Sequence, residues 1–356
     1  MSAATTASAA AQRGRLSSTR TLPRWFTAAA LVVAALIGYG IARVVGGGTI
    51  AAIVLALLAF VAGTTAVSLA VEGTRRATDR LAGTAVTAAF GIAMVPLVSL
   101  LYVVISRGAA RFDSTFFNES MRGVVGAGGG AYHAIVGTLI ITAITTVISV
   151  PIGLFTSVYL VEYGTGRLAK AITFLVDVMT GIPSIVAGLF AFALFALLSG
   201  DPGHRSGLAG AVALSVLMIP VVVRSTEEML RLVSNELREA AYALGVPKWL
   251  TITKVVVPTA LAGIVTGITL AIARVIGETA PLLITAGFTS SVNTDPLSDR
   301  MSSLPVFIYS QFTQPGVPPQ AGVDRAWSAA LVLILIVMLL NLIARIVSGV
   351  FSPKKA

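Results

Sequence analysis

The sequence predicts an all-α fold, a polytopic transmembrane helical bundle of about eight spans, from three observations. Hydrophobic residues make up 56% of the 356 residues, charged residues make up only 11%, and the mean hydropathy is +0.91. A soluble domain typically carries about 25% Asp, Glu, Lys and Arg, so the charge here is too sparse to coat a soluble surface of this size. Hydrophobic stretches also follow one another along the chain, each long enough to cross a bilayer as a helix.

The elements follow in order from this pattern. Residues 1–26 form a basic tail, rich in Ala, Ser and Thr and without an acid. Two closely spaced spans, 27–45 and 49–71, predict an N-terminal transmembrane hairpin. Six further spans are expected at 82–105, 132–161, 171–198, 208–226, 256–287 and 327–350. The glycine-rich segment 126–131 formally matches G-x-G-x-x-A, but no strand precedes it, so we expect a flexible linker and not a dinucleotide site.

The distribution of basic residues predicts the orientation. With both termini in the cytoplasm, the inner segments hold sixteen Lys and Arg and the outer loops hold seven. Cytoplasmic loops collect Lys and Arg, so we expect a multi-pass protein of the cytoplasmic (inner) membrane with both termini cytoplasmic. Because this topology accounts for the net charge of +10, no nucleic-acid partner is expected.

Motifs for bond-making chemistry are scarce in the sequence. There is no P-loop, no H-E-x-x-H and no G-x-S-x-G, and the chain has no cysteine and only two histidines, His133 and His204. We therefore expect no catalytic residue, no metal site and no cofactor, and a protein that moves a solute. ATP hydrolysis, if it drives the movement, is expected on a partner.

The longest inner connection, 227–255, is patterned as a helix. Four apolar residues recur at i, i+3, i+4 and i+7 and predict one apolar helical face: Leu237, Ala240, Ala241 and Leu244. Ser234 or Asn235 can cap its start, Gly245 can end it, and Pro247 prevents its continuation. Such a helix either lies in the lipid headgroups or docks on a soluble partner.

A longer pattern favours docking. Glu239-Ala240-Ala241, Gly245 and Val255-Val256-Val257-Pro258 resemble the EAA signature of ABC importer permeases, E-A-A-x3-G-x9-I-x-L-P, with valines in place of Ile and Leu. In that family the loop forms a coupling helix that sits in a cleft of the ATPase subunit. The resemblance implies a coupling helix at 234–249, with Glu239, Ala240, Ala241 and Gly245 at the ATPase.

Further segments resemble the permeases of the phosphate-specific ABC importer, of the PstA type, over roughly 82–350. They are Glu162-Tyr163-Gly164, Pro183-Ser184-Ile185-Val186, Ile219-Pro220-Val221-Val222-Val223-Arg224 and Gly277-Glu278-Thr279-Ala280-Pro281-Leu282-Leu283. The family core has six spans, which implies an ABC importer transmembrane domain at 82–350 and an accessory hairpin at 27–71.

The resemblance implies a permease subunit that forms half of the translocation pathway for inorganic phosphate. Its partners would be a sister permease, two copies of a cytoplasmic ATP-binding subunit, an extracytoplasmic phosphate-binding protein and the membrane lipid. A permease for another oxyanion is the near alternative. A proton-coupled secondary transporter is a more remote one.

Charged residues inside predicted spans indicate where a substrate passes, since such residues are costly in lipid. Arg274 and Glu278 stand at i, i+4 and are expected to meet on one helical face, either as an anion site in the pathway or as a structural pair. Arg224 is either a second pathway cation or an interfacial arginine that reaches the headgroups. Asp177 either pairs with an arginine or lies near the inner interface.

Overall fold

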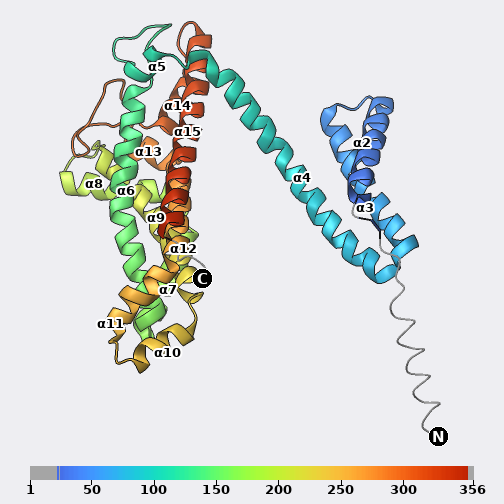
Figure 1. Ribbon diagram of the computed structural model, residues 1–356. Coiled ribbons are helices and arrows are strands. Elements are labelled where there is room, and N and C mark those ends of the chain that lie inside the picture. The colour runs from blue at the N-terminus through green and yellow to red at the C-terminus, as the bar shows by residue number, and fades with distance from the viewer. Residues whose placement is uncertain (1–21, 24, 352–356) are drawn as a thin grey trace. The chain divides into compact units, whose positions relative to one another are not determined.

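The structure is a computed structural model that describes residues 22, 23 and 25–351 (Figure 1). Over these residues it is helical and contains no strand, which confirms the predicted fold class. Most of the predicted basic tail, up to residue 21 and at residue 24, lies outside the described residues. The chain divides into two compact units, one up to Tyr102 and one from Val103 onward, and the division falls inside the long helix α4 (Thr74–Gly108).

The first unit contains the predicted hairpin, α2 (Phe26–Val45) and α3 (Thr49–Glu72), joined by three glycines. The hairpin packs closely because Gly38 of α2 lies directly against the backbone of Ala56. The carboxylate of Glu72 is compensated within the unit. It accepts hydrogen bonds from Ser68 Oγ at 2.7 Å and from the Leu22 N–H at 2.8 Å, and it pairs with Arg80 at 3.0 Å.

The second unit is a helical bundle built around α9 (Gly207–Arg231), its most buried helix (Figure 1). Its other elements are η1 (Ala109–Arg111), α5 (Ser114–Asn118), α6 (Tyr132–Val158), η2 (Tyr159–Tyr163), α7 (Gly166–Thr180), α8 (Ser184–Ser199), α10 (Asn235–Ala243), α11 (Lys248–Thr251), η3 (Ile252–Val256), α12 (Val257–Val275), α13 (Ala280–Thr285), α14 (Leu304–Thr313) and α15 (Pro319–Phe351). Small residues let the helices approach α9. Gly263 of α12 meets Met229 and Gly267 meets Ser225, so this G-x-x-x-G pair lets α12 pack closely on α9.

Seven helices in the described part of the chain are long and apolar enough to span a membrane. The pair α7 and α8 would make an eighth span, and the two helices are bent by 109° at the break between them. The stretch expected to form one span at 171–198 is therefore divided at residues 181–183 into two helices.

Two other prolines differ in their effect on the helices. Pro220 does not interrupt α9, because it is buried among neighbouring helices that stabilise the helical path. The span expected at 256–287 ends instead at Val275. Residues 276–279 form a non-helical turn, and α13 then begins with Pro281 in its first turn, where a missing N–H costs nothing.

At the end of the bundle that carries α5, called the α5 end below, the glycine-rich segment is fixed by two arginines. The buried Arg325 donates to the carbonyl oxygens of Gly126 and Gly128, both at 2.9 Å, and to Gln311 Oε1 at 2.8 Å. Arg111 donates to the Gly129 carbonyl at 3.0 Å. The expectation of a flexible linker is therefore wrong.

The opposite end, called the α10 end, contains two π-helical segments. The segment η2 extends α6, and η3 joins α11 to α12, so that one lies before α10 in the chain and one after it. A π-helical turn contains one more residue than an α-helical turn and is frequent at functional sites.

Candidate functional site

The helix α10 matches the predicted docking helix, with tighter limits than 234–249. It begins after Ser234 and ends at Ala243, and α11 forms a separate short helix after Pro247. Glu239 and Ala240 are exposed, and Ala241 packs inward. The predicted four-residue apolar face is not buried as a unit, because Leu244 lies beyond the last helical turn and is 83% exposed.

Gly245 forms the turn that ends α10. Its φ is +77°, in the left-handed region that residues with a Cβ avoid. The Gly245 N–H donates to the Tyr242 carbonyl at 2.9 Å, and the Val246 N–H donates to the Ala241 carbonyl at 3.1 Å. No other atom lies near the position that a Cβ would take at Gly245, so the backbone conformation, not crowding, requires glycine here.

Large apolar side chains in the segments before and after α10 are exposed. Leu232 is 76% exposed and Trp249 is 61% exposed, in addition to Leu244. Exposed apolar side chains of this size on a polar end of a protein are typical of an interaction surface.

Arg238 fastens α10 to the bundle. Its Nε and Nη2 donate to Glu162 Oε1 of η2 at 3.1 and 2.9 Å. The same guanidinium donates to the carbonyl oxygens of Leu230 at 3.0 Å and Val233 at 2.6 Å, beside the end of α9. The Glu162 and Arg238 side chains are only 5% and 13% exposed. Arg238 therefore connects α10 to η2, which extends α6, and to the end of α9.

Lys248 of α11 adds a second connection to η2. Its ammonium donates to the Glu162 carbonyl oxygen and lies 4.7 Å from the centre of the Tyr163 ring. Glu162 is thus held through both its side chain and its backbone. No role was predicted for Glu162 from the sequence, although it lies in the Glu162-Tyr163-Gly164 match.

Arg224 belongs to a network of charged side chains in the last two turns of α9, toward the α10 end. It pairs with Asp177 of α7 and, at 2.7 Å, with Glu227, which also pairs with Arg231 at 2.6 Å. The prediction that Asp177 may pair with an arginine is confirmed. Because two carboxylates compensate Arg224, the structure favours a role in joining α7 to α9 over a free cation in the pathway.

Arg274 and Glu278 do not form the expected helical pair. Arg274 lies in the last turn of α12, whereas Glu278 lies in the turn after the helix end, so the i, i+4 geometry is lost. Within the described residues, no ion pair joins them and the Arg274 side chain has no hydrogen-bond acceptor. Arg274 is exposed on the isolated chain, and Glu278 is half-buried.

A family model described as "Binding-protein-dependent transport system inner membrane component" matches residues 149–356. The chain is 50% identical over 284 residues to "Phosphate transport system permease protein PstA 1" of Mycobacterium tuberculosis (strain ATCC 25618 / H37Rv), which covers 79% of this chain and 91% of that protein. It is 42% identical over 258 residues to "Phosphate transport system permease protein PstA" of Pasteurella multocida (strain Pm70), covering 72% of this chain and 88% of that protein.

Solved structures show the same fold at low sequence identity. A bacterial alginate ABC transporter in complex with an alginate pentasaccharide-bound periplasmic protein gives a TM-score of 0.53 at 14% identity, over 75% of this chain and 93% of that chain. An inward-facing MetNI methionine ABC transporter gives a TM-score of 0.50 at 19% identity, over 61% of this chain and 94% of that chain.

Proposed function

The chain belongs to the family of binding-protein-dependent transport system inner membrane components, and from this we propose that it is the PstA-type permease subunit of an ATP-driven importer of inorganic phosphate. It is a non-catalytic subunit, and ATP is hydrolysed on a separate subunit. The finer assignment to phosphate rests on the names of relatives that are 42–50% identical to this chain.

The observation that carries the proposal is the α10 end of the bundle. An exposed helix and a glycine turn stand there, surrounded by exposed Leu232, Leu244 and Trp249. Arg238 connects this surface to α6 and α9. We propose that an ATP-binding subunit docks on Glu239, Ala240 and the Gly245 turn, which places the α10 end and both termini in the cytoplasm.

The remaining partners follow from the same assignment. A sister permease completes the pathway, two copies of the ATP-binding subunit drive it, and an extracytoplasmic phosphate-binding protein delivers phosphate at the α5 end. We propose Arg274 as a cation of the pathway, because its guanidinium is exposed on α12 and is left free within the described chain. A guanidinium presents a planar set of donors that matches phosphate oxygens. Glu278, half-buried one turn further on, lies beside the pathway without neutralising Arg274.

The substitution Gly245→Asp tests the docking assignment. It forces a side chain into the left-handed conformation, at a cost of about 1–2 kcal/mol, and adds a negative charge at the docking surface. We expect the ATPase to dissociate from the complex or to hydrolyse ATP without phosphate uptake, whereas the sister permease remains bound. The measurement is co-purification followed by phosphate uptake and ATP hydrolysis in vesicles.

Gly200→Asp is the matched control, because Gly200 has a φ of +71° and ends α8 outside the α10 surface. It should leave ATPase binding intact. Normal uptake in Gly245→Asp would contradict docking at this turn. Uptake that continues without any ATPase would instead indicate a secondary transporter.

A further inference from the structure

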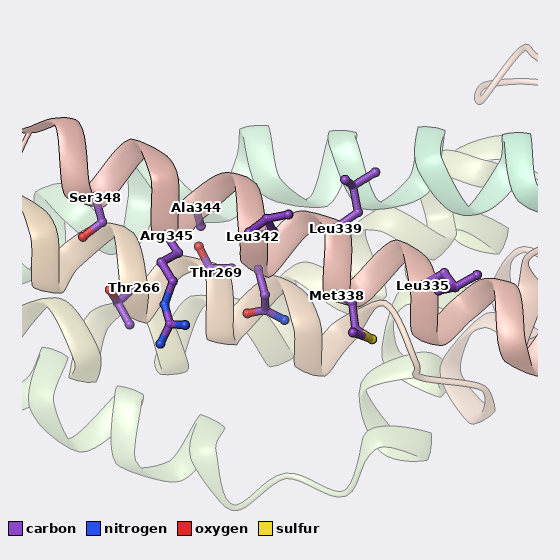
Figure 2. A pocket seen from close by; sticks show the side chains of 10 residues that line it. Thr266, Thr269, Leu335, Met338, Leu339, Leu342, Ala344, Arg345 and Ser348 are labelled. Carbon is purple, nitrogen blue, oxygen red and sulfur yellow. The ribbon is translucent and has the colours of Figure 1, made fainter. Parts of the chain in front are cut away.

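A groove of about 870 Å³ runs between α12 and α15 and contains a single charged side chain (Figure 2). Four uncharged polar residues line it together with Arg345: Thr266, Thr269, Asn341 and Ser348. Figure 2 shows the Arg345 side chain extending from α15 toward the side where Thr266 and Thr269 of α12 lie. The volume falls in the range of about 300–1,000 Å³ that is typical of ligand sites.

The hydrogen bonds in the groove leave Arg345 as its main free donor. The hydroxyl of Thr266 donates to the Ala262 carbonyl and that of Thr269 to the Val265 carbonyl, both at 2.8 Å. One N–H of the Asn341 amide donates to the Val337 carbonyl at 2.9 Å. The Arg345 guanidinium has no acceptor within the part of the chain that the structure describes.

The charge of the lining selects the kind of ligand. Among the residues that the structure describes, no carboxylate lines the groove, so Arg345 makes its charge positive, which favours an anion. Glu228 lines an adjoining hollow that shares Thr266 and Ser348 with the groove, and its negative charge disfavours an anion on that side. An arginine left against hydrocarbon is costly, and such residues usually face a pathway or a partner.

The groove continues the face of α12 that carries Arg274. Thr266, Leu270 and Arg274 stand at i, i+4 and i+8, and all three are exposed. At 1.5 Å per residue, Arg274 lies about 12 Å further along the helix than Thr266. Ser348 donates to the Ala262 carbonyl at 3.3 Å, so Arg345, one turn before Ser348 on α15, lies on the α10 side of Arg274.

We propose that this groove is a second oxyanion subsite, in which Arg345 binds a phosphate group on the α10 side of Arg274. This proposal rests on the proposed function, import of phosphate, which makes the α10 side of Arg274 the later part of the pathway. One guanidinium among neutral groups binds an anion loosely, as a site on a pathway must if the anion is to leave. The phosphate group belongs either to free phosphate in transit or to the headgroup of an anionic phospholipid.

The test compares the wild-type importer with Arg345→Gln, Arg345→Lys and the control Arg167→Gln, each reconstituted with all partner subunits. Arg167 is an exposed arginine at the start of α7, outside the groove. Phosphate uptake is measured in vesicles of phosphatidylcholine alone and of phosphatidylcholine mixed with phosphatidylglycerol. Thermal unfolding of each purified complex shows whether the variants are folded.

For free phosphate, Arg345→Gln slows uptake at least about tenfold in both kinds of vesicle, and Arg345→Lys, which keeps the charge but loses the bidentate geometry, lies in between. If the ligand is a lipid headgroup, phosphatidylglycerol stimulates uptake by the wild type and by Arg167→Gln but not by Arg345→Gln.

If Arg345→Gln does not fold, Asn341→Leu removes the remaining amide donor and should show the same pattern more weakly. Uptake by Arg345→Gln equal to wild type in both vesicles overturns the subsite. A wild-type complex that imports no phosphate overturns the proposed function instead.

Discussion

The charged residues of the α10 end and those of the α12–α15 face are treated in opposite ways by the fold. At the α10 end, Arg238 is paired with Glu162, and Arg224 is paired with Asp177 and Glu227. On the α12–α15 face, Arg274 and Arg345 are exposed, and neither has an ion-pair partner within the described residues.

This difference separates charges that hold the chain together from charges that are available to something else. The donors of a compensated arginine are already bound to carboxylates of the same chain, so its substitution should mainly lower the stability of the helix packing. An uncompensated arginine within a membrane span does not stabilise the isolated chain. Its substitution should therefore weaken the binding of a ligand or partner and leave the stability of the chain unchanged. The comparison therefore predicts different readouts for arginines that look alike in the sequence.

The largest effect is expected for Arg274→Gln. A hydrogen bond to a charged group contributes about 1.5–3 kcal/mol, or roughly 10- to 150-fold, so phosphate uptake should fall by at least tenfold. The melting temperature should not change, because Arg274 has no acceptor in the described chain. Arg122→Gln, an exposed arginine at the α5 end, is the control. A parallel loss of melting temperature and uptake would place Arg274 among the structural charges.

A smaller effect on uptake and a larger one on stability are expected for Glu162→Gln. Removing one partner of a buried ion pair leaves the other charge buried, at a cost of about 3–5 kcal/mol. Thermal unfolding should show this loss, and ATP hydrolysis should continue while uptake falls, because α10 no longer moves α6. The double variant Glu162→Gln with Arg238→Gln should recover part of the stability. Glu236→Gln, an exposed acid on α10, should behave as wild type; equal losses in both variants would contradict the pairing.

The smallest effect is expected when the N-terminal hairpin is removed. The contacts of Glu72 with Ser68 and Arg80 all lie within the first unit, and the second unit has its own core. Removing Glu72 leaves Arg80 without its partner, but that loss is confined to the first unit. A chain that begins at Arg75 should insert, assemble and import phosphate at a reduced but measurable rate. Vesicle uptake checks this, with assembly confirmed by co-purification. Complete loss of uptake in an assembled complex would mean that the hairpin is part of the pathway.

The local sequence was sufficient to predict where a helix ends when the contacts that end it lie within a few residues. Gly245 followed by Pro247 ends α10 within the backbone of a few residues, which confirms Gly245 as the end of this helix, although the predicted segment 234–249 also included the start of α11. Pro220 and Pro281 show the limit, since the same residue type continues one helix and begins another. The difference depends on what surrounds Pro220, which the neighbouring sequence does not contain. The Gly277 and Pro281 pair, however, was a readable signal that the span at 256–287 is interrupted.

The candidate site was predictable as a segment but not as a set of contacts. The helix was found from the spacing of its apolar residues, and the role of Glu239 to Gly245 was implied by the resemblance to the EAA signature, but the Arg238 pair joins residues 76 positions apart. The contact of Arg325 with Gly126 joins residues 199 positions apart. Periodicity relates residues within a few turns of one helix, so only the folded bundle shows which arginines have partners.

The number of residues in the π-helical segment η3 determines which way the α10 end faces relative to α12. Removing one residue from Ile252–Val256 would let the backbone return to an α-helix. Everything on the α10 side of it would then turn by about 100° around the axis of α12, which is the angle per residue of an α-helix. The Gly245 turn would face a different neighbour, and Arg238 would point away from Glu162. A deletion of one residue between α11 and α12 would thus redirect the docking surface while leaving every side chain on it unchanged.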